Sequence, residues 1–556
     1  MFASMLAQFL YVIDYSQYNS IILLSWIISL IISFIFLIRN VKKYCINGNK
    51  LNFFLLLKKY FLLIPILILG IFLRFYDLNK FPIVFHDEAK DTGLFPIKIL
   101  TGEIRDYFGF FAGINNVFFV ISTIPHLIFS DPIIKLRFFS ALFGSLSIII
   151  VYIYLSKIST KLTAFIGAFL FATYHVLIHF SRSEFLNLFD SFYTLVILLI
   201  FYYSTLKKNY FITGIFGLLI GLGFHFYSGI RPVLLISTAI YFVYLLLKTP
   251  FKRFLLHVII YLFFIIVAVG PTLIVFIDRP EEAMAMGTAK NIIINDKVVL
   301  STIFNNYITS LKTVTLTNID FHYNYGGPFL KFPLSIFFYL GLLFLIWNIK
   351  NINFLLIISL FFTIPFFNSA ILNTLNYTHR LLSFVSIIII ISSLGLNLLI
   401  IIFKRFNKSL SFIILSLILI FIYFQNINLY FIKNVWENAL YINEYRAWNV
   451  QKIINKYSIN SDFLFLGSDN MPSYKSVPPL EYLTSKYKIV DIFTEKELSQ
   501  QLEISLLNKK AILIFLIPES NLYEYFNNFK NRSYKITVFK KVYYKNKYLF
   551  DFYQIN

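Results

Sequence analysis

Residues 51–91 read LNFFLLLKKYFLLIPILILGIFLRFYDLNKFPIVFHDEAKD, an apolar run that leads into a cluster of charged side chains. The apolar part, about 53–73, is long enough to cross the roughly 30 Å hydrocarbon core of a membrane. The charged part, FHDEAKD at 85–91, brings Asp87 and Glu88 close to that core. A carboxylate at the bilayer centre costs on the order of 3 kcal/mol, so we interpret the pair as functional groups at the membrane edge.

The composition of the 556 residues is that of a polytopic membrane protein, because 58% are hydrophobic, 14% are charged and the mean hydropathy is +0.74. The single cysteine, Cys45, excludes an internal disulfide. Apolar runs of spanning length recur along the chain. We predict an α-helical bundle of about twelve spans, at 20–38, 54–73, 137–156, 162–180, 186–203, 210–226, 231–247, 254–277, 332–348, 353–370, 381–403 and 410–425.

The charges between these runs fix the predicted orientation. The connections on one side hold basic residues and no acid: Arg39, Lys42, Lys43, Lys50, Lys58, Lys59, Lys157, Lys161, Lys207, Lys208, Lys248, Lys252, Arg253, Lys350, Lys404, Arg405 and Lys408. Every acid falls in an outer loop, in the tail or, for Asp190, within a span. The positive-inside rule then places the N-terminus and the C-terminal tail outside the cytoplasm.

Two apolar segments are not counted as spans. A crossing at 114–130 would invert the charge pattern downstream, so we expect an interfacial or re-entrant element there, inside a long outer loop at 74–136. Residues 1–13 are too short to span and carry no basic residue, which argues against a signal peptide.

Three regions follow along the chain. Residues 1–53 form an extra span and its cytoplasmic connection, residues 54–425 form the main bundle with outer loops at 74–136 and 278–331, and residues 430–556 form an extracytoplasmic α/β domain. In that domain, apolar runs of strand length and amphipathic stretches predict secondary structure. We expect strands at 463–467 and 511–517, helices at 444–457, 494–507 and 519–530, and a hairpin at 536–553.

Asp87 and Glu88 are the first candidates for chemistry. Neighbouring residues on a helix point about 100° apart, so the pair cannot serve as the two facing carboxylates of a retaining glycosidase. One acid would act as general base while the other orients or binds. The alternative is a solvated loop mouth whose acids simply face water.

Basic residues at the outer ends of spans are the second group of candidates. Arg182, Arg231 and Arg380 each lie in a different short outer turn. Arginine is the preferred bidentate ligand of phosphate, so the convergence of these residues with Asp87 would create a pocket for a lipid-linked phosphate. Alternatively, each guanidinium extends separately to lipid headgroups.

Several other polar residues of the outer side are secondary candidates. His86, His322 and His379 would serve as ligands if a divalent metal joined Asp87, although no close-spaced metal motif is present. Asp106 shares the first outer loop, and Asn187 follows Arg182. Tyr323, in FHYNYGGP at 321–328, either stacks on a sugar or belongs to an interfacial aromatic belt.

Nucleotide and nucleic-acid binding are excluded by the pattern. The chain has no glycine-rich phosphate loop after a strand and no outward basic stripe, despite a formal charge of +22. A donor sugar on the outer side would therefore be carried by a lipid phosphate.

These motifs resemble those of the GT-C glycosyltransferases, in the branch of the protein O-mannosyltransferases and the aminoarabinose transferase of lipid A. The resemblance covers about 54–400. It rests on HDEA at 86–89, on FSDP at 129–132 followed by LRFFSALFG at 136–144, on FSR at 180–182 followed by Asn187, and on HRLL at 379–382.

The resemblance implies the roles of several residues. Asp87 would be the base toward the acceptor, with Glu88 and Lys90 in support. Arg182, Arg231, His379 and Arg380 would bind the donor phosphate. Asn187 occupies what resembles an acidic position in the aminoarabinose enzymes, and the Lys-Pro-Pro element of their first loop is missing here. Lipid A is therefore not the expected acceptor.

The leading hypothesis is an inverting glycosyltransferase of the plasma membrane that uses a polyprenyl-phosphate sugar. Its acceptor would be a glycan, a protein or a lipid, and its site would face away from the cytoplasm. The alternative is a lipid or glycolipid transporter, which would carry ionisable residues deep in its spans and interrupted helices. A mere anchor for the tail would not need a dozen spans.

Overall fold

The computed structural model describes residues 2–45, 61–111, 114–183, 186–284, 293–294, 297–298, 300–319, 323, 326–370, 378–434, 442–457, 461–466, 473–485, 489–494, 496–497, 500, 511–516, 536–544 and 547–555. The chain forms two compact units, which we describe separately. Unit 1 comprises Met1–Leu78, Thr101–Ile124 and Arg137–Trp436. Unit 2 comprises Asn79–Leu100, Pro125–Leu136 and Glu437–Asn556, so the first outer loop is divided between the units.

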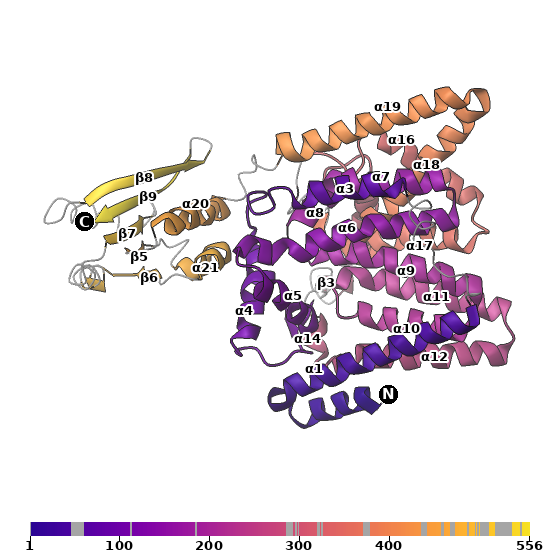
Figure 1. Ribbon diagram of the computed structural model, residues 1–556, viewed down its shortest axis with the longest axis horizontal. Coiled ribbons are helices and arrows are strands. Elements are labelled where there is room, and N and C mark those ends of the chain that lie inside the picture. Colours follow the sequence, from indigo (N-terminus) through magenta and orange to yellow (C-terminus); the bar gives the residue numbers. More distant parts are fainter. Residues whose placement is uncertain are drawn as a thin grey trace. The chain divides into compact units, whose positions relative to one another are not determined.

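Unit 1 is a helical bundle (Figure 1). Its helices are α1 (Phe2–Cys45), α3 (Leu63–Phe75), α5 (Asn116–Ile128), α6 (Pro132–Ile158), α7 (Lys161–Thr173), α8 (His175–Arg182), α9 (Asn187–Lys207), α10 (Tyr210–Gly223), α11 (Arg231–Lys248), α12 (Phe251–Val269), α13 (Thr272–Asp278), α14 (Pro280–Met284), α15 (Leu300–Lys312), α16 (Leu334–Trp347), α17 (Ile352–Pro365), α18 (Leu382–Phe406) and α19 (Lys408–Ile427). The short elements are η2 (Ser228–Ile230), η4 (Phe366–Ala370), η5 (Thr378–Leu381), η6 (Asn428–Asn434) and the antiparallel pairs β1 (Phe110–Phe111) with β2 (Ile114–Asn115) and β3 (Ile293–Ile294) with β4 (Lys297–Val298). The last residues of α5 and the first of α6 belong to unit 2.

Long apolar helices dominate the bundle. Within the described residues, seven helices are long and apolar enough to cross a membrane, or eight if the bent pair of α7 and α8 is one span. Each predicted span overlaps one of these or a shorter apolar helix, but the count of twelve stays a prediction. Helix α5, at the segment predicted to be interfacial, has 13 residues, fewer than the roughly 20 that a crossing needs.

The N-terminal helix α1 contains a break that the sequence analysis did not predict. Asp14 has extended backbone angles (φ −162°, ψ 99°), and the chain turns back on itself there (Figure 1). The Asp14 carboxylate accepts hydrogen bonds from the backbone N–H groups of Ser16 at 2.8 Å and Gln17 at 3.1 Å. Asp14 therefore caps the longer segment, which contains the predicted span at 20–38.

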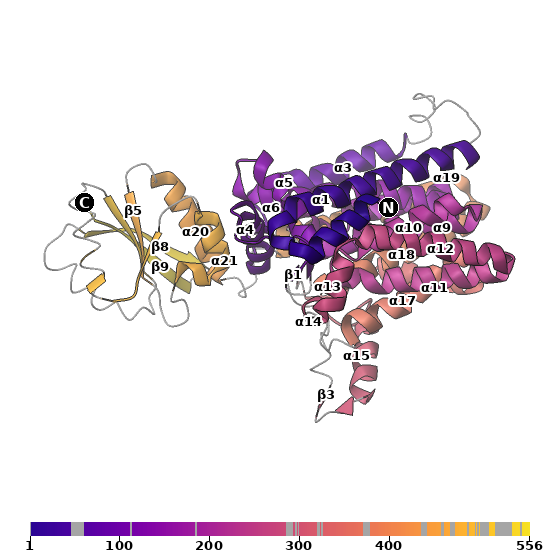
Figure 2. The ribbon, with the colours of Figure 1, turned by 90° about the horizontal axis from the view of Figure 1, so that it is seen from below.

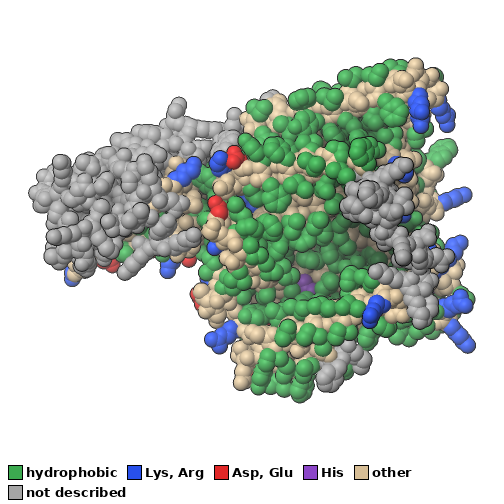
Figure 3. Space-filling model, viewed as in Figure 1, with side chains coloured by type: hydrophobic (Ala, Val, Ile, Leu, Met, Phe, Trp, Pro, Cys, Tyr) green, Lys and Arg blue, Asp and Glu red, His purple; other side chains and the backbone are tan. Residues whose placement is uncertain are grey.

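Four bundle helices begin at turns that were predicted to be cytoplasmic. In each, the residue before the helix accepts a hydrogen bond from a backbone N–H of the first turn, which satisfies a donor that the helix leaves unpaired. These residues are Thr160 for α7, Asn209 for α10, Asn351 for α17 and Asn407 for α19. Figure 3 shows a largely hydrophobic face on the bundle, with Lys and Arg side chains gathered along one edge.

Close helix packing at the centre of the bundle depends on small residues. A Cβ added to Gly341 of α16 would overlap the carbonyl oxygen of Ile391, and one added to Gly395 of α18 would overlap that of Phe337. Glycines of this kind allow two backbones to approach each other within a membrane. At the periphery, α1 runs beside α10 and α12 (Figure 2).

Unit 2 contains a mixed five-stranded sheet. Its elements are the π-helix η1 (Glu88–Leu94), α4 (Phe95–Leu100), α20 (Ile442–Tyr457), η8 (Tyr474–Ser476), α21 (Pro478–Thr484), β5 (Ser461–Leu466), β6 (Ile489–Ile492), β7 (Ala511–Leu516), β8 (Ile536–Tyr544) and β9 (Lys547–Ile555). The strand order is β6-β5-β7-β9-β8. Strands β6, β5 and β7 are parallel, whereas β9 pairs antiparallel with β7 and β8.

Several elements of unit 2 coincide with the sequence predictions. Helix α20, strands β5 and β7, and the β8–β9 pair lie at the predicted positions. The helices predicted at 494–507 and 519–530 fall largely outside the described residues. Strand β6 and helix α21 were not predicted, because both are too short to show a clear period in sequence.

Candidate functional site

Asp87 and Glu88 lie at the start of η1 in unit 2 and have different surroundings. Glu88 is fully buried, and its Oε2 accepts a hydrogen bond from the backbone N–H of Phe85 at 3.1 Å. The Glu88 carbonyl oxygen accepts a hydrogen bond from the Thr92 hydroxyl at 2.8 Å. Asp87 is half-buried. Glu88 therefore holds the loop, while Asp87 is the acid of the pair whose side chain reaches the surface of the unit.

Two further carboxyl groups interact with Asp87. Burial, together with the negative charge of Asp87, raises the pKa of Asp91 to about 7. The same causes, again with burial the larger, raise the pKa of Glu444 on α20 to about 7. Asp87 therefore lies near two acids that change charge around neutral pH.

Helices α20 and α21 form the core against which this loop packs. The apolar cluster of unit 2 joins Val84 and Ala89 of the loop to Trp448 of α20 and Leu480 of α21. Tyr482 of α21 donates a hydrogen bond to the Pro132 carbonyl oxygen at 2.8 Å. The Tyr482 ring covers Gly93, where an added Cβ would lie 2.7 Å from a ring carbon. The tail thus supports the loop that carries Asp87.

His86 and Lys90, predicted as supporting residues, are both exposed on this loop.

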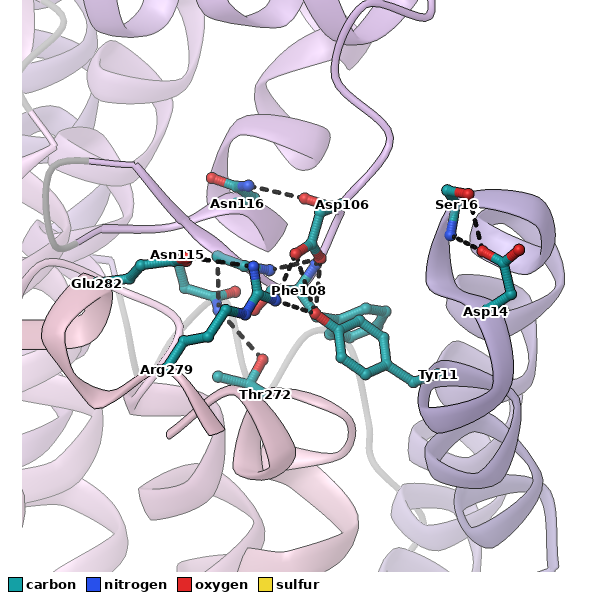
Figure 4. A network of polar contacts seen from close by, with 11 residues as sticks. Tyr11, Asp14, Ser16, Asp106, Phe108, Asn115, Asn116, Thr272, Arg279 and Glu282 are labelled. Carbon is teal, nitrogen blue, oxygen red and sulfur yellow. Dashed lines mark hydrogen bonds and ion pairs between the residues drawn. The ribbon is translucent and has the colours of Figure 1, made fainter. Parts of the chain in front are cut away.

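Asp106 lies in a polar network of unit 1 (Figure 4). Its carboxylate accepts hydrogen bonds from the Tyr11 hydroxyl at 2.8 Å and from Arg279 at 2.6 Å. It also accepts hydrogen bonds from the backbone N–H groups of Phe108 and Gly109. The network joins α1, the first outer loop and the end of α13. These contacts indicate a structural role for Asp106.

Three guanidinium groups, which we call the arginine cluster, are buried around the end of α3. Arg74, Arg137 and Arg182 are each at most 1% exposed. Arg74 donates to the carbonyl oxygens of Phe171 at 2.8 Å and Ala172 at 3.0 Å, which are the last carbonyls of α7 before its break. A cation bound to the carbonyl end of a helix is stabilised by the helix dipole.

Arg182 is oriented in a similar way. Its Nη1 donates to the carbonyl oxygens of Leu73 at 3.0 Å and Arg74 at 3.2 Å, and its Nη2 donates to that of Asp77 at 3.3 Å. Arg137 donates to the Leu78 carbonyl oxygen at 3.0 Å. Much of the donor capacity of this cluster is therefore directed at backbone carbonyls.

A second group of polar side chains lies at the start of α9 and α11, where Asn187 and Asp190 are buried and Arg231 is half-buried. We call Asn187, Asp190 and Arg231 the polar triad. Within the described residues, Asn187 Nδ2, Asp190 Oδ1 and Arg231 Nη2 are each buried with no hydrogen-bond partner. Asp190 and Arg231 attract each other electrostatically. Asn187 and Asp190 are three residues apart on one helix and therefore share a face.

Asn368 of η4 connects the polar triad to Arg380. Its Nδ2 donates to the Gly229 carbonyl oxygen at 2.8 Å and to the Arg380 carbonyl oxygen at 3.2 Å. Gly229 contacts Asp190, since a Cβ at this glycine would overlap Asp190 Oδ2. The structure therefore brings the turn before Arg231 and the turn that holds Arg380 and the buried His379 together.

Tyr323 links the outer loop to α8 and η5. Its ring stacks on His179 at 4.3 Å between centroids, and its hydroxyl lies 2.8 Å from His175 Nδ1. The Tyr323 carbonyl oxygen accepts a hydrogen bond from the Thr378 hydroxyl at 3.2 Å. Residue 322, the other candidate in this segment, lies outside the described residues.

In the described part of the chain, no three His, Cys, Asp or Glu side chains come close enough together to hold a metal ion.

Sequence reasoning did not select Arg74, Asn368, Glu444 or Tyr482, and it noted Asp190 only as an acid within a span. Arg74 had a usable signal, because it is a lone cation at the end of an apolar run. Asp190 had one too, since it lies one turn after Asn187. Glu444 and Tyr482 had none, because their position near the loop depends on contacts between residues hundreds of positions apart.

Comparison with known proteins gives two informative matches. Residues 117–275 match the family of dolichyl-phosphate-mannose-protein mannosyltransferases. This segment contains Arg182 and the polar triad. No curated protein sequence matches the chain.

Solved structures supply the second match. ArnT from Cupriavidus metallidurans in the apo state matches with a TM-score of 0.52 and 11% sequence identity, over 89% of this chain and 98% of that chain. The same protein bound to undecaprenyl phosphate matches over the same shares with a TM-score of 0.50 and 11% identity. The oligosaccharyltransferase AglB from Archaeoglobus fulgidus, in complex with an inhibitory peptide and a dolichol-phosphate, gives a TM-score of 0.46 and 14% identity over 82% of this chain and 70% of that chain. Over 117–275 the chain is thus similar to the mannosyltransferase family, and over most of its length it shares the fold of ArnT.

Proposed function

We propose that the protein is an inverting glycosyltransferase that moves a sugar from a polyprenyl-phosphate donor to an acceptor hydroxyl at the outer face of the plasma membrane. The match of 117–275 to a family named for dolichyl-phosphate mannose carries this proposal. The fold shared with ArnT, which has been solved with undecaprenyl phosphate bound, supports a lipid phosphate as carrier. The acceptor is a glycan, a protein or a lipid.

The proposed reaction is a single displacement at the anomeric carbon. The acceptor oxygen forms a bond to this carbon and gives its proton to the Asp87 carboxylate. The bond from the anomeric carbon to the phosphate oxygen breaks, the configuration inverts, and polyprenyl phosphate leaves with the bonding electrons. Cationic side chains stabilise the charge that develops on this phosphate.

Arg231, His379 and Arg380 are the proposed phosphate ligands. Their support is the Asn368 side chain, which bonds the backbone at Gly229 and at Arg380 and so keeps the two turns together. Arg182 is proposed as a positioning residue of the same site, because its Nη1 and Nη2 donate to carbonyl oxygens of the α3 end. A guanidinium fork suits phosphate through paired N–H donors.

The remaining candidates have supporting roles in the proposal. Glu88 fixes the backbone that presents Asp87, as its hydrogen bond with the Phe85 N–H suggests. His86 and Lys90 lie on the exposed side of the loop, where an acceptor would arrive. Tyr323 is buried against His179 and His175, so its proposed role is to position the second outer loop.

The test is sugar transfer by the purified protein in lipid nanodiscs. Radiolabelled sugars on undecaprenyl phosphate and dolichyl phosphate are supplied with an envelope extract from cells that lack the protein. We expect the wild type to label an acceptor, with a product whose anomeric configuration is opposite to that of the donor. We expect Asp87→Asn to lose about 10²- to 10⁴-fold in rate, the usual worth of a general base.

Glu103→Gln is the matched control, because Glu103 is an exposed acid of the same outer loop. It should keep the wild-type rate. Transfer by Asp87→Asn at the wild-type rate would remove Asp87 from the proposal, a product of unchanged configuration would refute inversion, and the absence of label from every lipid donor would refute the function.

Two observations keep a lipid transporter as the second candidate. Helices α7 and α8 form a span that is bent by 52° at a break, and Asp190 is buried within the bundle. Interrupted helices and buried ionisable groups are both features of transporters. Movement of a fluorescent polyprenyl phosphate between the leaflets of liposomes, without acceptor, would favour this candidate.

A further inference from the structure

The polar triad contains hydrogen-bonding groups that have no partner among the residues that the structure describes. Asn187 is 4% exposed and Asp190 is 1% exposed, and both belong to the first turn of α9. Asn187 Nδ2, Asp190 Oδ1 and Arg231 Nη2 have no hydrogen-bond partner within the described residues. Buried polar groups are nearly always bonded, because an unmet donor or acceptor away from water is costly. Unmet groups on these neighbouring elements call for a molecule that bonds them, either water or a ligand with hydroxyl groups.

The surrounding structure holds these groups in place. Gly229 has no side chain, which leaves the space that Asp190 Oδ2 occupies. The Gly229 carbonyl oxygen accepts hydrogen bonds from Asn368 Nδ2 at 2.8 Å and from the Ser383 hydroxyl at 3.4 Å. The turn before Arg231 is thus fixed from two other elements, and the triad does not depend on a mobile surface loop.

The chemistry of the three groups selects the ligand. Asp190 Oδ1 needs a donor, whereas Asn187 Nδ2 and Arg231 Nη2 need acceptors. An ionised phosphate offers acceptors only and leaves Asp190 Oδ1 unmet. An ammonium or metal cation offers nothing to Asn187 Nδ2 or Arg231 Nη2. Hydroxyl groups donate and accept at once, so a ligand with neighbouring hydroxyls matches all three.

We propose that the polar triad is the site that recognises the sugar of the lipid-linked donor. One sugar hydroxyl donates to Asp190 Oδ1, and hydroxyl oxygens accept from Asn187 Nδ2 and Arg231 Nη2. Asn368 joins the turn before Arg231 to Arg380, so the sugar site adjoins His379 and Arg380. Arg231 belongs to both sites, with Nη2 directed to the sugar and its other nitrogens left for the phosphate. The inference rests on the proposed function and adds which residues select the sugar.

The experiment compares the binding of two lipids to the full-length protein in nanodiscs. The probes are undecaprenyl phosphate alone and a panel of undecaprenyl-phosphate hexoses. Asp190→Asn keeps the shape of the side chain but replaces one carboxyl oxygen by a donor. We expect it to weaken binding of the preferred glycosylated lipid by at least about tenfold and to change binding of the bare phosphate by less than twofold.

Ser191→Ala is the matched control in the same helix. The Ser191 hydroxyl is buried and hydrogen-bonds Ser386 at 2.6 Å, outside the triad. We expect both affinities to stay within twofold of the wild type. This control separates disturbance of α9 from loss of a specific partner.

A deoxy-sugar series tests the same contact from the ligand side and does not rely on a variant that folds poorly. Removal of the hydroxyl that donates to Asp190 should weaken binding to the wild type at least tenfold and leave binding to Asp190→Asn unchanged. Equal weakening of both lipids by Asp190→Asn, or no monodeoxy donor that distinguishes the two proteins, would overturn the proposal. If the wild type binds neither lipid, the proposed function itself fails.

Discussion

Two polar sites in the same bundle differ in where the N–H donors of their arginines point. In the arginine cluster, Arg74 donates to the carbonyl oxygens of Gly70, Phe171 and Ala172 and to the Ser181 hydroxyl. In the polar triad, Arg231 Nη2 has no hydrogen-bond partner within the described residues. Burial of an arginine is therefore no sign of a ligand site by itself. The account of its hydrogen bonds separates a structural cation from one that awaits a partner.

The arginine cluster also explains how the bundle tolerates the break between α7 and α8. Helix α7 ends at Thr173, where the chain bends by 52° into α8. The last carbonyls of a helix have no partner within it, and lipid offers none. Arg74 supplies the donors at this break, so its N–H groups bond carbonyl oxygens that water would bond in a soluble protein.

The sharpest test of this contrast is Arg74→Met, which keeps an unbranched side chain but removes every donor. The carbonyl oxygens of Phe171 and Ala172 would lose their Arg74 hydrogen bonds, so we expect a loss of about 3–5 kcal/mol of stability. Thermal unfolding of the purified protein in detergent measures the loss. An unfolding temperature equal to that of the wild type would show that these bonds do not hold the break together.

The opposite result is expected for Arg231→Met. The change is made in an Asp190→Asn background, so that no buried carboxylate loses its cationic partner. It should leave the unfolding temperature within a few degrees of that background and lower the rate of sugar transfer at least about 100-fold. Unfolding and transfer are measured on the same preparation. A variant that unfolds early but transfers normally would reverse the assignment of the two groups.

A matched pair of glycine substitutions tests the same comparison with a smaller expected effect. In Gly144→Ala the new Cβ would overlap the Ser181 hydroxyl and lie 3.0 Å from Arg74 Nε, whereas in Gly229→Ala it would overlap Asp190 Oδ2. Each overpacking should cost about 1–3 kcal/mol. We expect Gly144→Ala to lower stability chiefly, and Gly229→Ala to weaken donor binding as well. Equal donor affinities in the two variants would contradict this distinction.

The smallest expected effect concerns pH and the acids of unit 2. Burial raises the pKa of Asp91 to about 7, whereas an unfolded aspartate titrates near 3.9. The folded state therefore binds this proton more tightly. The resulting stability is complete below about pH 4 and is lost as the pH rises through about 7.

Asp91→Asn should therefore reduce the difference between the unfolding temperatures at pH 5 and pH 8. Glu103→Gln, which removes an exposed acid, serves as the control. A pH dependence in Asp91→Asn as steep as in the wild type would contradict the prediction.

The apolar runs predicted where the long bundle helices lie, but not the break at Asp14 or the short helices α4 and α21. Thr160 and Asn407, which cap α7 and α19, show that the ends of spans also have local signals. The break at Tyr174 is different. It contains neither Gly nor Pro, and the segment 162–180 reads as one continuous span. Hydrogen bonds between residues far apart in the sequence, such as those of Arg74, make the break possible. No local sequence pattern predicts them.

The candidate site was predictable in its residue types but not in its contacts. The acids at 87 and 88 and the arginines of the outer turns stand out because charge is rare in this chain. That Arg182 donates to the carbonyl oxygens of Leu73 and Arg74 depends on side-chain directions set by packing. Sequence alone gave Arg182 and Arg231 the same role.

The inclusion of residues 79–100 and 437–556 in one compact unit has a consequence for biogenesis. The segment Asn79–Leu100, which we call the acid loop because it carries Asp87 and Glu88, leaves the ribosome early. The helices and strands that pack against it are translated last, beginning 337 residues after Leu100. At roughly 5–20 residues per second, that interval lasts roughly 20–70 s. Prematurely terminated chains would insert a bundle that lacks the support for Asp87, so only a finished polypeptide assembles the acid loop.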